Sequence, residues 1–422
     1  MEGYNHNVVT DGSAHFLKTL TTALPCFSPS TRAVHADDVL NNADDVAPPI
    51  HVTTTYRYPR DVDRLQPHHE RPSYPVLEIG EHCYSRQSTP GISRLEAVLS
   101  SILGQPCIAY SSGIAAFHAL LNMLNPKRVS IGAGYHGCHG TLQLYSRASG
   151  CEMLPLDCAI DQLGPGDLIH LETPVNPTGL ASNIRHYADR AHARGAYLSV
   201  DSTFAPPPLQ DAFLHGADVV MHSGTKYIGG HSDFLCGVLA VKDEAWLQRL
   251  HQDRLYLGSV MAGFDSWLAT RSIRTLEMRV LRQSHSAEYI VRALHSGLLP
   301  QTSSFLSNED VLTVRKVVEE VHHASLQADV ETEGWLRNQM PRGYGPVFAL
   351  TLRDADFARK LPSKLLLFHH ATSLGGVESL IEWRTMTDST VTRDFLRLSI
   401  GVESPEDLLA DLIQGLRAVA ND

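Results

Sequence analysis

The chain has 422 residues, 43% of them hydrophobic and 19% charged, a composition typical of globular proteins that bury a large core. A formal net charge of −11 argues against nucleic acid or an anionic membrane surface as the main partner. Seven scattered cysteines without a C-x-x-C pair indicate reduced thiols, and no segment resembles a signal peptide or a bilayer-spanning run, so we expect a cytoplasmic protein.

Residues 1–88 are irregular and rich in proline, aspartate and histidine. A long segment without secondary structure in a compact protein is usually packed on something, and we expect this arm to contact a neighbouring subunit. His68-His69-Glu70 has the residue types of a metal site. A solvated loop is the favoured interpretation, because no predicted helix or strand orders these side chains.

Regular alternation of strands and helices begins near residue 89. Ser93 and Glu96 have the spacing of a capping box, which predicts a helix start there and a stop at Gly104. A short strand at 107–110 then leads through Ser112 and Gly113 into an apolar helix over 114–124. Such a turn offers backbone N–H groups to an anion, although Ser112 is equally often only a helix cap.

A lysine and an aspartate each follow a predicted strand farther along the chain. Asp201 ends the strand 196–200, and Lys226 lies just beyond the strand 218–221. The carboxyl ends of parallel strands meet at one sheet edge, where ligands bind. An acid and a lysine at that edge suit pyridoxal phosphate (PLP): the lysine bonds to the cofactor and the carboxylate keeps the ring nitrogen protonated. Ser223 and Thr225 would then bind the phosphate opposite Ser112. A surface lysine and a turn-forming aspartate are the simpler alternatives.

Two loops at the same edge carry further candidates. Tyr135 opens a glycine-rich loop and could lie on the cofactor ring. His136, Cys138 and His139 follow it, but neighbouring loop residues rarely converge on one metal ion, so we predict no metal site. Asn176 lies in a turn-rich loop, where it is either a turn former or a hydrogen-bonding partner of the ring oxygen.

The alternation over 89–277 predicts an α/β fold with a mainly parallel sheet covered by helices on both faces. Residues 278–422 read as a smaller α+β domain. Arg397 alternates with apolar residues on a predicted strand there. It is either exposed on the sheet or faces a carboxylate, and the pattern alone favours neither.

From about residue 31 to the end, the chain resembles the Cys/Met-metabolism family of PLP-dependent enzymes, with its cystathionine γ-synthases, cystathionine and methionine γ-lyases and O-acetylhomoserine sulfhydrylases. The run 378–384 is most similar to fungal-type cystathionine γ-synthase-like members. The matching motifs are Thr31-Arg-Ala-Val-His35, Pro48-Pro-Ile50, Tyr84-Ser-Arg86, Ser112-Gly-Ile114, Tyr135, Glu172-Thr-Pro-Val-Asn-Pro-Thr178, Val200-Asp-Ser-Thr-Phe204, His222-Ser-Gly-Thr-Lys-Tyr-Ile-Gly-Gly-His-Ser-Asp233, Ser373-Leu-Gly-Gly-Val-Glu-Ser-Leu380 and Arg397-Leu-Ser-Ile-Gly-Val-Glu403.

The resemblance implies PLP fold type I and a role for each matching residue. Lys226 would bond to PLP and move protons, Asp201 would pair with the ring nitrogen, and Tyr135 would stack on the ring and act as acid or base. It also implies homodimers or homotetramers with shared active sites. The implied cofactor-binding residues are Tyr84 and Arg86 from the neighbouring subunit, with Ser112, Gly113, Ile114, Tyr135, Asn176, Asp201, Ser223, Thr225 and Lys226. The implied substrate-binding residues are Asn176, Ser373 and Arg397, which would receive the α-carboxylate of an amino acid.

The implied reaction is γ-replacement on an O-activated homoserine, with cysteine or another thiol or carbon nucleophile. Elimination of the cystathionine or methionine γ-lyase type is the alternative, and a catalytically silent PLP-binding protein is a third. The chain departs from the family's usual pattern at Ser88-Thr89-Pro90, in its longer tyrosine loop, at Thr372, where many members have glutamate, and at Asp388, where histidine is usual. Because Thr372 replaces that glutamate, the sequence does not identify the second substrate, the nucleophile.

Overall fold

The computed structural model describes residues 18–41, 45–65, 67, 82–300, 303–328 and 334–422. His68, His69 and Glu70 lie outside the described residues, as does much of the predicted N-terminal arm. No helix of the described ranges is long and apolar enough to cross a membrane. The described part of the arm holds the short elements η1 (Leu24–Cys26), α2 (Pro29–His35), η2 (Asp38–Leu40) and η3 (Val62–Arg64).

The larger domain is built on a seven-stranded sheet in the order β1-β7-β6-β5-β4-β2-β3. All of its strand pairs are parallel except those of β7, which runs antiparallel to both neighbours. The predicted, mainly parallel sheet is therefore confirmed. Its strands are β1 (Cys107–Tyr110), β2 (Arg128–Ile131), β3 (Glu152–Pro155), β4 (Leu168–Glu172), β5 (Tyr197–Asp201), β6 (Val219–Ser223) and β7 (Gly237–Val241).

Helices cover both faces of this sheet, because its central strands are apolar on both sides. Along β7, Val238 and Ala240 point into one core, while Leu239 and Val241 point into the other. The first core packs against α3, α6 and α8, and the second against α4, α5 and α7. The helices of this domain are α3 (Pro90–Leu103), α4 (Gly113–Leu124), α5 (His136–Ser149), η5 (Ile160–Gln162), α6 (Ile184–His192), η6 (Ala212–His215), α7 (Glu244–Leu257) and α8 (Gly263–Ile273).

The predicted capping box at the start of α3 is wrong. The helix begins one turn earlier: Thr89 Oγ1 accepts the N–H of Ile92 at 3.1 Å, and Pro90 occupies the first helical position. Glu96 instead points inward, where its Oε1 accepts the N–H of Ala109 at 2.9 Å and pairs with the Arg254 guanidinium at 2.5 Å. Thr89 followed by Pro90 therefore determines the start of α3, and not the pair Ser93 and Glu96.

The smaller domain has a five-stranded sheet in the order β10-β11-β12-β9-β8, antiparallel except for the pair β10–β11. One further apolar core lies between this sheet and its helices. The elements are α9 (Leu276–Leu298), α10 (Asn308–Val317), β8 (Val318–His322), η7 (Ala324–Leu326), α11 (Trp335–Gln339), β9 (Val347–Leu352), α12 (Ala355–Lys360), η9 (Leu361–Lys364), β10 (His369–His370), β11 (Leu380–Trp383), η10 (Arg384–Met386), β12 (Phe395–Ser399) and α13 (Pro405–Asn421).

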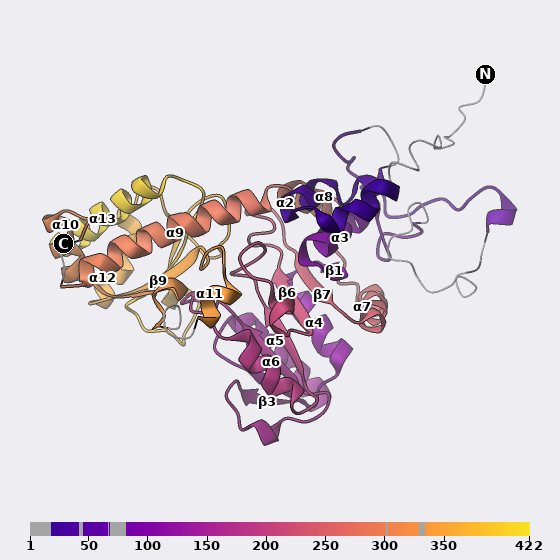
Figure 1. Cartoon of the computed structure of the whole chain (residues 1–422), viewed down its shortest axis with the longest axis horizontal. Helices are drawn as coiled ribbons and strands as arrows, with labels where there is room; N and C mark the ends of the chain where they lie inside the picture. Colours follow the sequence, from indigo (N-terminus) through magenta and orange to yellow (C-terminus); the bar gives the residue numbers. More distant parts are fainter. Residues whose placement is uncertain (1–17, 42–44, 66, 68–81, 301–302, 329–333) are drawn as a thin grey trace.

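One long helix, α9, runs from the larger domain into the smaller one (Figure 1). Its first residues, Leu276 and Val280, belong to the core of the larger domain. Ile290 and Leu294, three turns later, belong to the core of the smaller one. The same helix therefore fixes the position of both domains.

Candidate active site

Three polar side chains mark one edge of the large sheet. Glu172, Asp201 and Ser223 are the last residues of β4, β5 and β6, which are parallel neighbours. Their side chains therefore meet at the carboxyl ends of the strands, where the sequence predicted the site.

Lys226 lies in the turn that follows β6 and reaches the smaller domain. Its Nζ donates a hydrogen bond to Ser373 Oγ at 2.7 Å. Burial, with a contribution from nearby Arg397, lowers the pKa of the Lys226 ammonium to about 8, although Glu382 acts in the opposite direction. The amine is thus partly neutral near physiological pH, as a lysine that forms a covalent bond or accepts a proton must be.

The loop that carries Ser373 approaches the lysine turn very closely. A Cβ on Gly375 would lie 2.8 Å from the backbone of Lys226 and Tyr227, and the residue has a φ of 83°. Only glycine fits such an approach in this conformation. Ser373 itself has a φ of 73°, which is uncommon for a residue other than glycine, asparagine or aspartate and is typical of functional sites.

Two residues of α9 hold these loops in place. Arg279 Nη1 donates to the carbonyl oxygen of Tyr227 at 2.7 Å. Gln283 Nε2 donates to the carbonyl oxygen of Gly376 at 2.7 Å. Both side chains are buried, so the lysine turn and the serine loop are each attached to the helix that joins the domains.

Asp201 is buried and accepts hydrogen bonds from the N–H and the hydroxyl of Thr203, at 3.0 and 2.5 Å. Burial raises the pKa of its carboxyl in spite of these two bonds. Among the described residues, no basic side chain forms an ion pair with it. A buried acid in this state is suited to a cationic ligand group, and the protonated ring nitrogen of PLP is such a group. The residues present therefore fit the predicted cofactor.

The predicted phosphate site lies where α4 begins. Ser112 Oγ caps the helix by accepting the N–H of Ala115 at 3.1 Å. A Cβ on Gly113 would lie 3.1 Å from the side chain of Ser223, so the start of α4 and the end of β6 are in contact. Gly113 and Ile114 are in the first turn of the helix, whose N–H groups have no intrahelical acceptors and suit a phosphate. The hydroxyl of Thr225 accepts the N–H of Cys236 at 2.9 Å.

Tyr135 is at the start of α5 and is partly exposed. Its N–H donates to Glu172 Oε2 at 2.7 Å, and Glu172 Oε1 accepts the N–H of Asn176 at 2.7 Å. Glu172, which sequence reasoning did not assign, thus ties the tyrosine loop to the asparagine loop. Burial, above all, raises the pKa of the Tyr135 phenol, so this group keeps its proton at neutral pH.

Arg397, on β12, is buried and faces a carboxylate. Its Nη2 lies 2.6 Å from Glu382 Oε2 and donates to the carbonyl oxygen of Ser373 at 2.7 Å. Its Nη1 donates to Asn176 Oδ1 at 3.0 Å. Of the two alternatives left open by the sequence pattern, the inward-facing arginine is the one observed. Lys226, Ser373, Asn176 and Arg397 therefore form one hydrogen-bonded group.

A buried ionic network continues beyond Arg397 and was missed by the sequence analysis. Glu382 also pairs with Arg384 Nη1 at 3.1 Å, and Arg384 Nη2 pairs with Asp388 Oδ2 at 3.3 Å. Thr387 Oγ1 donates to Glu382 Oε1 at 2.6 Å. Glu382 lies directly opposite Arg397 in the antiparallel pair β11–β12. Only the register of these two strands brings Glu382 and Arg397 together, and the sequence does not reveal that register.

Tyr84 and Arg86 have described contacts away from this group. The Arg86 guanidinium carbon lies 5.5 Å from the centre of the Tyr84 ring, and Arg86 Nη1 donates to the carbonyl oxygen of Leu255 at 2.6 Å. Tyr84 is exposed. Both residues are thus on a surface of the single chain, where a neighbouring subunit could use them.

The three residues considered as metal ligands do not converge. His136 packs its ring against Tyr135, with centroids 4.9 Å apart, and His139 Nε2 hydrogen-bonds the carbonyl of Gly132 at 2.9 Å. Cys138 points inward instead.

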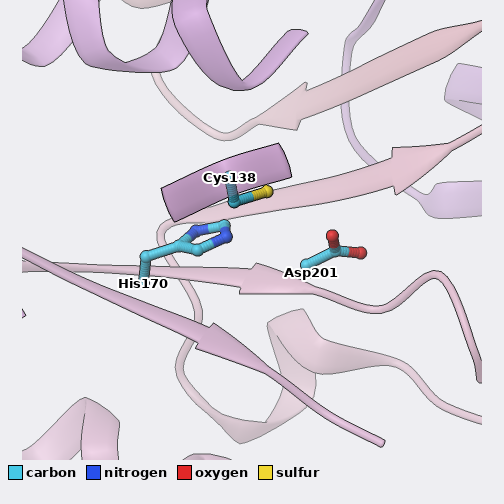
Figure 2. Close-up of side chains that lie close together, drawn as sticks. All are labelled: Cys138, His170 and Asp201. Carbon is cyan, nitrogen blue, oxygen red and sulfur yellow. The ribbon is translucent and has the colours of Figure 1, made fainter. Parts of the chain in front are cut away.

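Cys138, His170 and Asp201 form a buried cluster whose ligand-type atoms lie within 4.8 Å of one another (Figure 2). His170 Nδ1 is 2.8 Å from Ser199 Oγ, and its ring packs on Phe117 with centroids 4.5 Å apart. Burial raises the pKa of the Cys138 thiol, and the neighbouring Asp201 carboxylate adds to this effect. Burial lowers the pKa of the His170 imidazole to about 3. The thiol and the imidazole are therefore both neutral groups beside the aspartate.

The chain is similar to known proteins over almost its whole length. A sequence model of the family described as "Cys/Met metabolism PLP-dependent enzyme" matches residues 30–417. Cystathionine gamma-lyase of Saccharomyces cerevisiae is 30% identical over 416 residues, which cover 93% of this chain and 98% of the yeast protein. The structure of apo CalE6, a methionine gamma lyase from Micromonospora echinospora, is 30% identical with a TM-score of 0.77 and covers 93% of this chain and 99% of that chain. The structure of metB from Corynebacterium glutamicum is 28% identical with a TM-score of 0.79, covering 94% and 99%. The chain therefore belongs to the Cys/Met metabolism family of PLP-dependent enzymes.

Proposed function

We propose that the protein is a PLP-dependent lyase that cleaves the Cγ–S bond of a thioether amino acid such as cystathionine. The observation that carries this proposal is the hydrogen-bonded group in which Lys226, a proton-transfer residue, is linked through Ser373 to Arg397, a binding group for an α-carboxylate. Such a pair selects α-amino acids and places a base beside the carbon that bears the carboxylate. The yeast and Micromonospora relatives are named as γ-lyases, which supports elimination over replacement.

The PLP ring, once bound, withdraws electrons from the α-carbon of the substrate. Arg397 orients the substrate through its carboxylate, and Asn176 and Ser373 hold the guanidinium in place. Lys226, whose amine has a pKa lowered to about 8, would take the α-proton and pass it on to the bound cofactor. The amine, neutral again, would then take a β-proton. Tyr135, a phenol at neutral pH, donates a proton to the sulfur that leaves Cγ. The products are a thiol and, after hydrolysis, a 2-oxo acid and ammonia.

We also propose that each site is completed by Tyr84 and Arg86 of a neighbouring subunit. The exposure of Tyr84 and the position of both residues on the surface of one chain support this arrangement.

A second candidate is γ-replacement on an O-activated homoserine. It is supported by the run 378–384, which resembles fungal-type cystathionine γ-synthase-like enzymes, and by Arg384 within that run, which is buried beside the group that holds Arg397. Thr372 offers no carboxylate for the ammonium group of cysteine as a second substrate.

The two candidates differ in product. The purified, PLP-loaded enzyme is given cystathionine alone, and in a second reaction O-acetylhomoserine with excess cysteine, and the products are identified by mass spectrometry. We expect cysteine and 2-oxobutanoate from cystathionine. If cystathionine is untouched and accumulates in the second reaction, replacement is the function. A normal cofactor spectrum without product in either reaction would leave only the silent alternative.

A further inference from the structure

A cavity of about 300 Å³ lies beneath the large sheet, on the face opposite to Asp201 and Ser223. Side chains alternate along a strand, so His222 projects to the other side of β6 from its neighbour Ser223. The apolar part of the cavity lining belongs to the first core of the larger domain and includes Ile102, Leu103 and Leu209. The cavity is thus separate from the candidate active site, although it touches the same strand.

His222 is the unusual residue of this cavity. It is 1% exposed, and neither ring nitrogen has a hydrogen-bond partner among the described residues. Each buried polar group left without a partner costs about 1–3 kcal/mol, so an unpaired imidazole points to a group that is not part of the chain. Burial lowers the pKa of His222 to about 4. The neutral ring therefore presents one donor and one acceptor to the cavity.

The charged residues of the cavity wall favour an anion. Arg32 donates through Nη1 to the carbonyl oxygen of Ser101, but its buried Nε has no partner among the described residues. Arg342 is already paired, with Nη1 at 2.9 Å from Glu277 Oε1. Asp211 uses its carboxylate to cap η6. The Asp211 carboxylate keeps its negative charge, but it is exposed to solvent. The buried wall groups without a partner among the described residues that can bind an anion are therefore Arg32 Nε and the His222 ring.

We propose that this cavity binds a small carboxylic acid that carries one further hydrogen-bonding oxygen and no ammonium group, as in the aliphatic 2-oxo acids. The carboxylate pairs with Arg32, the oxo oxygen accepts the N–H of His222, and the short alkyl chain packs on Leu103 and Leu209. A zwitterionic amino acid of the same size is disfavoured, because its ammonium group would lie near Arg32 and Arg342, while the acid of the wall, Asp211, is exposed to solvent and caps η6.

Binding at this site would affect the cofactor site directly. His222 and Ser223 are consecutive residues at the end of β6, so a ligand on His222 restrains the strand end that carries the predicted phosphate-binding serine. The binding site itself does not depend on the reaction proposed above. If that reaction is correct, the ligand class is also that of its product, and the cavity senses product accumulation.

The test is equilibrium dialysis of the PLP-loaded enzyme with labelled 2-oxobutanoate. We expect two bound molecules per chain, one in the cavity and one that depends on Arg397. Arg32→Met and His222→Phe should each lose one of them, while Arg397→Ala keeps the cavity molecule. The matched control is Arg337→Met, an exposed arginine of α11 outside the cavity wall, which should bind like the wild type. Arg32→Met is the variant least disturbing to the fold, because Arg32 is partly exposed on α2.

Two analogues test the ligand class in Arg397→Ala, in which only the cavity remains. Butanoate lacks the oxo oxygen and should bind about tenfold more weakly or worse. The proposal is overturned if Arg32→Met and His222→Phe bind as much 2-oxobutanoate as the wild type, or if Arg397→Ala binds none. It is also overturned if 2-aminobutanoate, which carries the ammonium group, binds to the cavity as tightly as 2-oxobutanoate.

Discussion

Replacing Glu382 with glutamine tests the ionic network that holds Arg397, the residue proposed to bind the substrate carboxylate. Glu382 is 2% exposed and shares its charge between Arg397, at 2.6 Å, and Arg384, at 3.1 Å. Glu382→Gln leaves two buried guanidinium groups with Asp388 as their remaining acid. Removing one partner of a buried ion pair costs about 3–5 kcal/mol, and this pair is too buried for water to screen it. We therefore expect the free energy of unfolding to fall by about 3–5 kcal/mol.

Urea unfolding of the PLP-loaded enzyme, followed by tryptophan fluorescence, measures this loss. Trp383 is next to Glu382 on β11 and packs against the core of the smaller domain, so it reports local loss of structure. Glu319→Gln is the matched control, because it breaks an exposed ion pair with Arg353 in the same domain. Losing such an exposed pair lowers the free energy of unfolding by only about 0–1 kcal/mol. If Glu382→Gln unfolds at the same urea concentration as this control, the network does not stabilise the site.

Four further predictions concern the site itself. Borohydride should fix the cofactor on Lys226, and Lys226→Ala should abolish turnover; a label mapped by mass spectrometry to another lysine would contradict the assignment. Inactive Lys226→Ala chains mixed with inactive Arg86→Ala chains should regain part of the activity, since a hybrid dimer has one intact site, and no recovery after proven subunit exchange would argue against shared sites. Burial and Asp201 raise the pKa of Glu172 to about 8 from 4.5, so the stability that its bound proton contributes is complete below pH 4.5 and is lost as the pH rises through 8. Glu172→Gln should remove that part of the decline, and equal changes in urea midpoint with pH for both proteins would refute the assignment. If γ-replacement, the second candidate, is the reaction, Thr372→Glu should raise the preference for cysteine over a simple alkyl thiol as nucleophile by roughly tenfold, measured by product partition in competition.

The fold and the outline of the site could be predicted because their signals are local. Apolar runs that end in polar residues reveal strand ends, and parallel topology brings those ends to one sheet edge. Asp201 and Lys226 could therefore be placed at the same sheet edge from the sequence, at the end of β5 and just after β6. The start of α3 was misplaced because two overlapping signals competed, and the threonine before Pro90 prevailed over the capping box at Ser93 and Glu96.

The rest of the site depends on contacts between distant segments. The pairing of Glu382 with Arg397 follows from the register of two antiparallel strands, and strand alternation alone could not distinguish an inward from an outward arginine. Glu96 and Arg254 are 158 residues apart and meet only in the folded protein. The His222 imidazole has no hydrogen-bond partner in the part of the chain that the structure describes. This too is a property of the packed structure, since nothing in the motif of His222 shows what surrounds the ring.

The helix α9 has a mechanical consequence. Its first turns pack in one core and its last turns in the other. In its first half, Arg279 and Gln283 donate hydrogen bonds to the lysine turn and the serine loop. The two domains therefore cannot rotate as separate rigid bodies without bending a continuous helix or breaking buried hydrogen bonds. The distance between Lys226 and Arg397 is therefore maintained by a continuous helix and not set by a hinge.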